Sequence, residues 1–306
     1  MSTRAWAGFA AMSALWGIPY LFIKIAVDDG VPPAFVAWSR VVLGAVVLLA
    51  LARRAGTLPS LRGVRRGRWL ALYALFEITI PFPAIAFGER HISSSLTAIV
   101  IACVPLMVAG LAIRFDHAER ATGKRLAGLL LGLAGVVALV GIDVAGHSKE
   151  MLGVAAVLLG AFGYSVGPMV LKRQLSHLDP RATMGVSLAW AALFLLPLAS
   201  ADPPTSMPSS GALVAIAVLG LLCTAMAFVV FGHLIAEIGP GRALVITYIN
   251  PVVALAAGVI VLGESPGPGA IAGLLLILAG SWLSTDGRLP ARMTTVLRPR
   301  SNSARP

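Results

Sequence analysis

The sequence predicts an all-α integral membrane protein of ten transmembrane helices, and composition and the recurrence of apolar runs lead to this fold class. Hydrophobic residues make up 58% of the 306 residues and charged residues only 12%, against about 45–50% and about 25% in soluble domains. An apolar stretch of about 20 residues can cross a bilayer as a helix. Such stretches predict ten spans, numbered here in chain order: 5–27, 34–52, 69–88, 94–114, 124–142, 151–171, 182–200, 211–232, 241–262 and 267–285.

Positive charge sets the expected orientation of these spans. A net charge of +11 could suggest nucleic acid as a partner, but Lys and Arg are concentrated on one side of the predicted membrane. With the N-terminus inside, all but four of the 24 basic residues fall in inner segments; the exceptions are Lys24, Arg40, Arg90 and Lys149. Because basic residues are enriched in cytoplasmic loops, we expect both termini to be cytoplasmic and expect no nucleic-acid partner.

The two halves of the chain resemble each other. "LTAIVIACVPLMVAG" aligns with "ALVITYINPVVALAAG", which places Pro105 on Pro251 and, further along, Glu119 on Glu264. We read this as a duplication, with a first repeat over 5–142, a second over 151–285, and a basic cytoplasmic tail over 286–306 that is predicted to be disordered. Each repeat holds five spans, an odd number, so the second copy must enter the membrane from the opposite side. Such an inverted repeat gives a solute pathway two interconvertible conformations.

Several blocks carry a resemblance to a known family: "LWGIPYLFIK", "ERHISSSLTAIVIACVP" and "CTAMAFVVFGHLIAEIGPGRALVITYINPVVALAAGVIVLGE". The chain resembles the drug/metabolite transporter superfamily, in the branch with two EamA-type domains. The resemblance implies a ten-helix carrier of the bacterial inner membrane with a central cavity between its halves. We therefore expect a secondary transporter that exports a small metabolite, such as an amino acid or drug-like compound, by alternating access. Its expected partners are the lipid bilayer and a small-molecule substrate, and it is expected as a monomer or homodimer.

The third span contains "LFEITIPFPAIAFGER", in which Glu77 is followed by Pro81 and Pro83. Glu77 would lie about 12 Å into a core of about 30 Å, where a carboxylate usually faces a cavity, a partner charge or a proton path. Pro81 has no N–H for the Glu77 carbonyl four residues earlier. We expect Tyr73, Glu77 and Pro81 to share one helix face, with Glu77 as the candidate for proton coupling. The alternative is a glutamate that only joins helices.

Prolines interrupt other spans in the same way, at Pro19, Pro105, Pro168 and Pro251. Interrupted helices at corresponding positions of two repeats point to a transporter's binding site, although kinks that serve packing are common too. Aromatic and hydrogen-bonding side chains near these prolines suit a small amphipathic solute, and a given Ser or Thr could instead join two helices. The predicted substrate-binding residues are Trp16, Tyr20, Tyr73, Glu77, Tyr164, Ser165, Thr224, Tyr248 and Asn250.

Arg40 is the candidate charge partner within the second span. It lies about 9 Å from the outer end of that span, a depth from which its side chain can extend outward to the membrane surface. The family resemblance implies instead a fixed partner or a substrate carboxylate. Pairing with Glu77 would have to bridge about 8 Å of depth, and we expect it less than the other two roles. Lys24, nearer the outer edge, is expected to extend outward.

We predict no metal site, no cofactor and no catalytic residues. All five histidines fall in loops or at span ends, and Cys103 and Cys223 fall within spans, as small buried hydrophobes do. Neither a phosphate-binding Gly-Lys motif nor a Ser/His/Asp grouping occurs. The alternatives to a transporter are an integral-membrane enzyme acting on a lipid or prenyl substrate, which needs paired acidic or His residues near a leaflet surface, and a non-transporting membrane sensor or assembly subunit.

Overall fold

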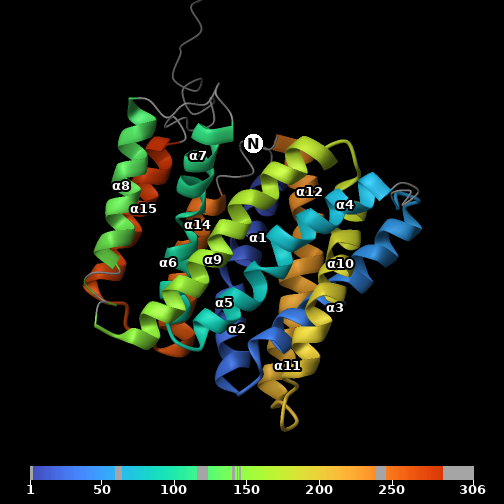
Figure 1. Cartoon of the computed structure of the whole chain (residues 1–306), viewed down its shortest axis with the longest axis horizontal. Helices are drawn as coiled ribbons and strands as arrows, with labels where there is room; N and C mark the ends of the chain where they lie inside the picture. The colour runs from blue at the N-terminus through green and yellow to red at the C-terminus, as the bar shows by residue number, and fades with distance from the viewer. Residues whose placement is uncertain are drawn as a thin grey trace, which may run out of the picture.

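The structure is a computed structural model that describes residues 3–58, 64–115, 123–139, 142, 144, 146–238 and 246–284. These residues form helices joined by short loops, without a strand among them (Figure 1). The predicted all-α fold class is therefore confirmed. The tail over 286–306 lies outside the described residues, and its disorder stays a prediction.

The first half of the chain contains several spans that are built from more than one helical segment. A π-helical segment, marked η, occurs in the third span. The segments are α1 (Thr3–Gly17), α2 (Pro19–Asp28), α3 (Pro33–Arg54), α4 (Val64–Ala74), η1 (Leu75–Thr79), α5 (Pro81–Glu89), α6 (Ser94–Ile101), α7 (Val104–Phe115) and α8 (Lys124–Leu139).

The second half repeats this order, again with π-helical segments inside two of its spans. Its segments are α9 (Ser148–Val170), η4 (Leu171–Leu175), α10 (Pro180–Ala201), α11 (Ser210–Ala217), η5 (Val218–Met226), α12 (Ala227–Ile238), α14 (Ile246–Leu262) and α15 (Pro268–Ser284). Polar side chains start several helices: Asp179, Ser93 and Ser209 accept backbone N–H groups in the first turns of α10, α6 and α11. Each caps a helix end that would otherwise leave donors unpaired.

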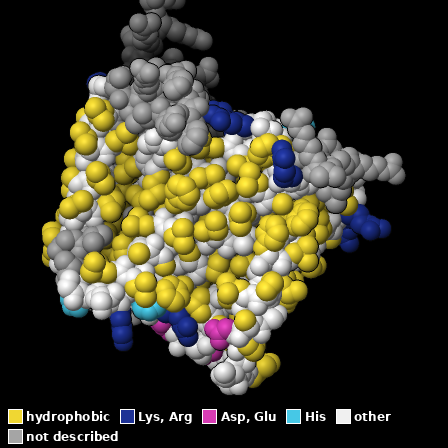
Figure 2. Space-filling view, in the orientation of Figure 1, with side chains coloured by type: hydrophobic (Ala, Val, Ile, Leu, Met, Phe, Trp, Pro, Cys, Tyr) yellow, Lys and Arg dark blue, Asp and Glu magenta, His cyan; other side chains and the backbone are white. Residues whose placement is uncertain are grey.

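Within the described ranges, six helices are long and apolar enough to cross a bilayer: Thr3–Asp28, Pro33–Arg54, Gly67–Glu89, Ser148–Leu175, Pro180–Ala201 and Ser210–Leu234. Four shorter apolar helices stand at the places of the other predicted spans: Ser94–Val108, Leu126–Leu139, Ile249–Leu262 and Pro268–Leu283. Hydrophobic side chains cover most of the middle of the face shown in Figure 2, and the charged side chains in view lie toward its edges. The count of ten crossings and the cytoplasmic position of both termini stay predictions.

The third span changes helix type just before its prolines. The Ile80 N–H donates to the Leu75 carbonyl, five residues back, at 3.0 Å, and Pro81 then starts α5 without an N–H of its own. A π turn holds one residue more than an α turn, so the α-helical spacing is shifted across it. The eighth span contains the π segment η5, and the first span is interrupted at Ile18, between α1 and α2.

Equivalent spans of the two halves pack side by side in opposite directions. On α3 and α10, Gly44 faces Leu188, whereas Gly185 faces Leu48 and Leu49. Residue numbers therefore rise along one helix as they fall along the other. This antiparallel pairing of the second and seventh spans is the arrangement that an inverted repeat requires.

The fifth and tenth spans, α8 and α15, form the second such pair, at the left edge of Figure 1. Gly280 of α15 lies against the backbone of Gly132, and Gly273 lies against Leu139, so this pair is antiparallel too. Contacts between spans that are not equivalent also occur as matching pairs in the two halves. The third span packs on the sixth through α5 and α9, and the eighth packs on the first through α11 and α12 against α2 and α1.

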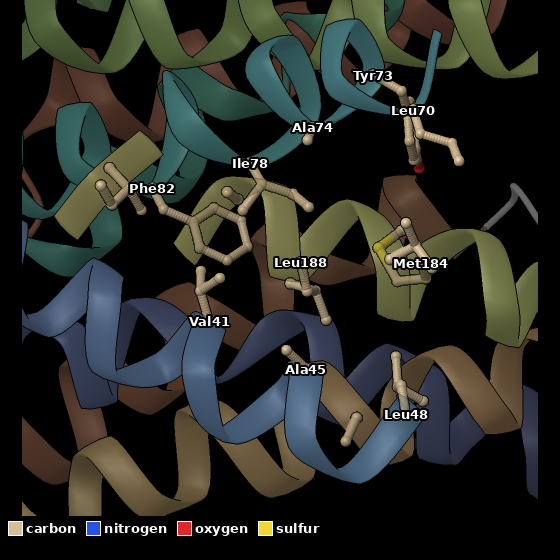
Figure 3. Close-up of a cluster of buried hydrophobic side chains, with 14 of the residues drawn as sticks. Val41, Ala45, Leu48, Leu70, Tyr73, Ala74, Ile78, Phe82, Met184 and Leu188 are labelled. Carbon is tan, nitrogen blue, oxygen red and sulfur yellow. The ribbon is translucent and has the colours of Figure 1, made fainter. Parts of the chain in front are cut away.

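The largest apolar cluster lies where α3, the third span and α10 meet. Val41, Leu48, Ile78, Phe82 and Leu188 belong to it (Figure 3). A separate cluster joins α6, α9 and α15. The first cluster packs the third span against α3 of its own half and α10 of the other half, which positions the polar residues of that span.

The glycine contacts of α15 generate a stability prediction. A Cβ atom on Gly280 would collide with the backbone of Gly132 and Gly128, and overpacking of this kind costs about 1–3 kcal/mol. Gly280→Ala should therefore lower the melting temperature of the purified protein in detergent. Gly232→Ala is the matched control, because Gly232 is a helical glycine of α12 with open space at its Cβ position, and it should be neutral or slightly stabilising. Equal melting temperatures for the two variants would contradict the packing described here.

Candidate functional site

Glu77 lies in the π turn η1 and faces α9. A Cβ atom added to Gly167 of α9 would overlap the Glu77 carboxylate, so the glycine leaves the room that this side chain occupies. Glu77 Oε2 is buried and makes no hydrogen bond within the described part of the chain, and the same holds for the Thr79 hydroxyl. The Glu77 carboxylate therefore keeps one oxygen without a hydrogen-bond partner among the described residues.

The expected shared face of Tyr73, Glu77 and Pro81 runs through the π turn η1, where the α-helical i, i+4, i+8 spacing does not continue. Pro81 contacts α9 at Gly163, close to where Glu77 contacts it. Tyr73 is 3% exposed, belongs to the apolar cluster with Leu70 and residues of α10 (Figure 3), and is within electrostatic range of Glu77. That the three residues face one solute cavity stays a prediction.

Of the roles left open for Arg40, the structure shows a fixed partner and not extension to the membrane surface. Its side chain is buried at 8% exposure, and Nε donates to Thr224 Oγ1 at 2.9 Å. Thr224 in turn donates to the Leu219 carbonyl at 2.8 Å, and the guanidinium lies 4.1 Å from the centre of the Phe82 ring. Arg40 thus has fixed partners in η5 and α5, because the π segment η5 presents the Thr224 oxygen to α3.

The structure does not bring Arg40 and Glu77 together. Among the described residues no ion pair joins them, and Gly167, which contacts Glu77, is on α9, whereas Gly220, which contacts the Arg40 carbonyl, is on η5. Arg40 is instead within electrostatic range of Tyr20 and Tyr164. Arg40 and Glu77 are therefore not paired with each other, although Tyr164 is within electrostatic range of both.

Trp16 and Asn250 lie near the interruption of the first span. The Trp16 ring packs at 4.7 Å from Phe231 and at 5.8 Å from Phe228, measured between ring centres. Asn250 is in α14, whose backbone approaches Gly17, and its Oδ1 is buried without a hydrogen bond in the described part of the chain. Trp16 has the contacts of a packing residue, whereas Asn250 keeps an unused acceptor.

Ser165 and Tyr248 complete the predicted set. The Ser165 hydroxyl is fully buried and donates to the Ala161 carbonyl of its own helix at 2.8 Å. This bond lies within α9 and is neither a contact between two helices nor a free donor for a solute. The Tyr248 side chain lies outside the described residues. Its role stays a prediction.

Glu89, at the end of α5, is a buried carboxylate that the sequence reasoning missed. It is 0% exposed, and neither carboxylate oxygen has a hydrogen-bond partner among the described residues. The Lys24 ammonium lies close by but donates to the Glu89 main-chain carbonyl at 2.8 Å and pairs with Asp28 at 3.0 Å. Glu89 ends an apolar span beside Arg90 and His91, so the sequence suggested only a loop residue.

Glu264 joins the second half of the chain to the first. Its carboxylate accepts hydrogen bonds from Ser94 N at 2.7 Å, Ser95 N at 2.9 Å and Ser95 Oγ at 2.5 Å, at the start of α6. Burial alone would raise the pKa of Glu264, but the hydrogen bonds from Ser95 and Ser94 outweigh it, so the pKa lies below its ordinary value of 4.5. We call this contact the Glu264 clamp.

Two apolar grooves flank Trp69. One measures about 500 Å³ and is lined mainly by α4 residues and Phe194; the other measures about 430 Å³ and lies between Trp69, Leu111 and α9. None of the predicted substrate-binding residues lines either groove. The described residues also contain no group of three or more His, Cys, Asp or Glu that could hold a metal ion.

The chain belongs to the EamA-like transporter family, which it matches twice, over residues 4–141 and 151–285. A protein of known crystal structure has a TM-score of 0.62 at 23% identity, over 93% of this chain and 98% of its own. At that identity the likeness shows the fold alone.

Named relatives with similar sequences are membrane transporters. The "Probable amino-acid metabolite efflux pump" of Salmonella typhimurium is 27% identical over 92% of this chain and 95% of its own length. The "Probable terminal-alkyne amino-acid exporter" of Streptantibioticus cattleyicolor is 29% identical over 92% of this chain and 93% of its own. The "Uncharacterized inner membrane transporter YedA" of Escherichia coli K12 is 27% identical, over 83% and 82%.

The Glu264 clamp generates a pH-dependent prediction. Because the folded-state pKa is lowered, the clamp stabilises the protein fully above the ordinary pKa, and this stabilisation is lost as the pH falls through the lowered value. Glu264→Gln should cost about 1 kcal/mol at neutral pH, a figure reduced for the half-exposed site. The difference in melting temperature between Glu264→Gln and the wild type should shrink as the pH falls to about 3. Asp202→Asn, at an exposed carboxylate after α10, is the control and should show no such convergence. A constant difference across the pH range would disprove the assignment.

Proposed function

Because the chain belongs to the EamA-like transporter family and is a multi-pass protein of the bacterial inner membrane, we propose that it is a secondary exporter of a small metabolite. The solute is an amino acid or a similar drug-like compound, moved by alternating access between the two halves. The family match over both halves is the observation that carries this proposal. The names of two relatives, an amino-acid metabolite efflux pump and an amino-acid exporter, support the solute class.

The antiparallel pairing of equivalent helices supports alternating access. α3 faces α10 and α8 faces α15, each pair with one helix from either half. If the halves exchange conformations, the contacts that close one side of the membrane have counterparts that close the other. The Glu264 clamp, which ties α6 of the first half to the loop before α15, is one such closing contact.

Glu77 is the proposed proton-coupling residue. It stands about 15 Å from the start of the span Gly67–Glu89, near the middle of the bilayer. Its Oε2 atom has no hydrogen-bond partner in the described residues, and a carboxyl group at this depth is usually retained for a functional reason. A carboxyl that takes up a proton on one side of the membrane and releases it on the other would couple solute flux to the proton gradient.

The coupling role predicts the behaviour of Glu77→Gln in proteoliposomes. The variant cannot exchange a proton at this position, so flux of a responding amino acid should lose most of its dependence on the pH gradient. Wild-type and variant flux would be measured with a panel of labelled amino acids, with Asp202→Asn as the matched change of an exposed carboxylate. If Glu77→Gln responds to pH as the wild type does, Glu77 is not the coupling group. If the wild type moves no solute and co-purifies with a stable protein partner, the role of an assembly subunit is favoured over transport.

The contact between Gly167 and Glu77 predicts a second variant that impairs transport. A methyl group at Gly167 would take the space of the Glu77 carboxylate, so Gly167→Ala should displace that side chain and reduce flux. Gly232→Ala adds the same methyl group to open space and should transport like the wild type. Equal flux from Gly167→Ala and Gly232→Ala, at equal protein in the vesicles, would show that the position of the Glu77 carboxylate does not matter for transport.

A further inference from the structure

Two buried groups of opposite charge, Glu89 and Arg40, lie in the outer half of the protein without forming an ion pair. Glu89 is 0% exposed and Arg40 is 8% exposed. No salt bridge joins them in the described part of the chain. A buried carboxylate without a hydrogen-bond donor is costly, and Arg40 uses only its Nε–H among the described residues. A ligand that carries both charges would complete the two groups.

The donors around Glu89 are used elsewhere. Lys24 donates to the main-chain carbonyl of Glu89 and pairs with Asp28, so it leaves the Glu89 carboxylate unbound. The Glu264 carboxylate, which is within electrostatic range of Glu89, accepts hydrogen bonds from Ser94 and Ser95. Both Glu89 carboxylate oxygens are left without a donor among the described residues, and an ammonium group is the ligand chemistry that fits them.

Arg40 presents the complementary surface. Its Nε–H is taken by Thr224, while its two terminal amino groups have no hydrogen bond within the described residues. One face of the guanidinium lies on the Phe82 ring, which holds the plane in place. A guanidinium with its paired terminal N–H groups unused binds a carboxylate in bidentate fashion.

Arg40 and Glu89 lie beside the same helix. Phe82, which lies under the Arg40 guanidinium, and Glu89 are seven residues apart on α5. Seven residues are about two helical turns, so Phe82 and Glu89 are on one face of α5. The two charged groups are within electrostatic range of each other, which suits a ligand that carries both charges.

We propose that Glu89 and Arg40 bind the ammonium and the carboxylate of a zwitterionic amino acid. This inference rests on the proposed function and assigns the residues that would recognise the solute. Tyr20, which is within electrostatic range of both charged groups, lies beside the site and contributes an aromatic wall. Recognition then requires both charges on the ligand, so an amine or a carboxylic acid of the same skeleton binds poorly.

The test is ligand-induced thermal stabilisation of the purified full chain in detergent. The probes are L-phenylalanine with phenethylamine and hydrocinnamate, and L-leucine with isoamylamine and isocaproate. We expect the wild type to be stabilised by at least one of the two amino acids and to bind the corresponding amine and acid at least about tenfold more weakly. Absence of any response to both amino acids, or equal responses to amino acid and amine, would overturn the proposal.

Variants separate the two charged contacts. Glu89→Gln should weaken binding of the amino acid at least about tenfold while leaving binding of the acid unchanged, and Arg40→Met should weaken amino acid and acid alike but spare the amine. Arg40→Lys keeps the charge and should restore part of the binding. Asp28→Asn, which removes a more exposed carboxylate beside Lys24, is the matched control and should bind as the wild type does. The melting temperature of each variant without ligand reports whether it folds.

The outcomes also distinguish this inference from the proposed function. If vesicles containing the wild type transport an amino acid and Glu89→Gln binds and transports it equally well, the exporter stands and the assignment of Glu89 fails. If the charge selectivity is found in binding but vesicles show no flux, the site stands and the exporter fails.

Discussion

The close approach of helix backbones across glycine is the interaction on which the rest of the structure depends. Within a bilayer, apolar side chains gain little by leaving lipid for one another, so small residues that permit close van der Waals packing hold helices together. Gly280 lies against Gly132 where α15 meets α8, and Gly88 lies against Gly153 where α5 meets α9. These contacts join the two halves of the chain, so any movement of one half against the other must rearrange them together.

The same close approach decides which polar groups are satisfied. Gly258 allows Glu264 to reach Ser94 and Ser95, since a Cβ atom at Gly258 would meet all three side chains. Gly167 leaves room for Glu77 but supplies no hydrogen bond to its Oε2 atom. Helix packing thus provides the Glu264 carboxylate with three donors and leaves Glu77 Oε2 without one among the described residues. In the proposed cycle Glu264 closes the outer side of the protein and Glu77 carries the proton.

Sequence reasoning predicted the apolar helices and the resemblance of both halves to one family, because these follow from local composition and motifs. It treated the third span as one continuous α-helix, and η1 interrupts that helix between Tyr73 and Pro81. It left the role of Arg40 open between outward extension and a fixed partner, because the depth of an arginine does not reveal that Thr224, 184 residues away in sequence, accepts its hydrogen bond. Glu89 was overlooked since a carboxylate at the end of a span reads as a solvated loop residue.

The sequence by itself determined that the chain is an all-α membrane protein whose family match covers both halves, because hydrophobicity and repeated motifs are properties of the chain. Only the tertiary structure decided which charges are partnered, since a hydrogen bond between α3 and η5, or between Glu264 and the start of α6, needs helices brought together from distant parts of the sequence. Arg40 and Glu264 found partners by that packing. Within the described part of the chain, Glu77 and Glu89 keep carboxylate oxygens without a hydrogen-bond partner, because Gly167 offers Glu77 no donor and Lys24 donates to the Glu89 main chain instead.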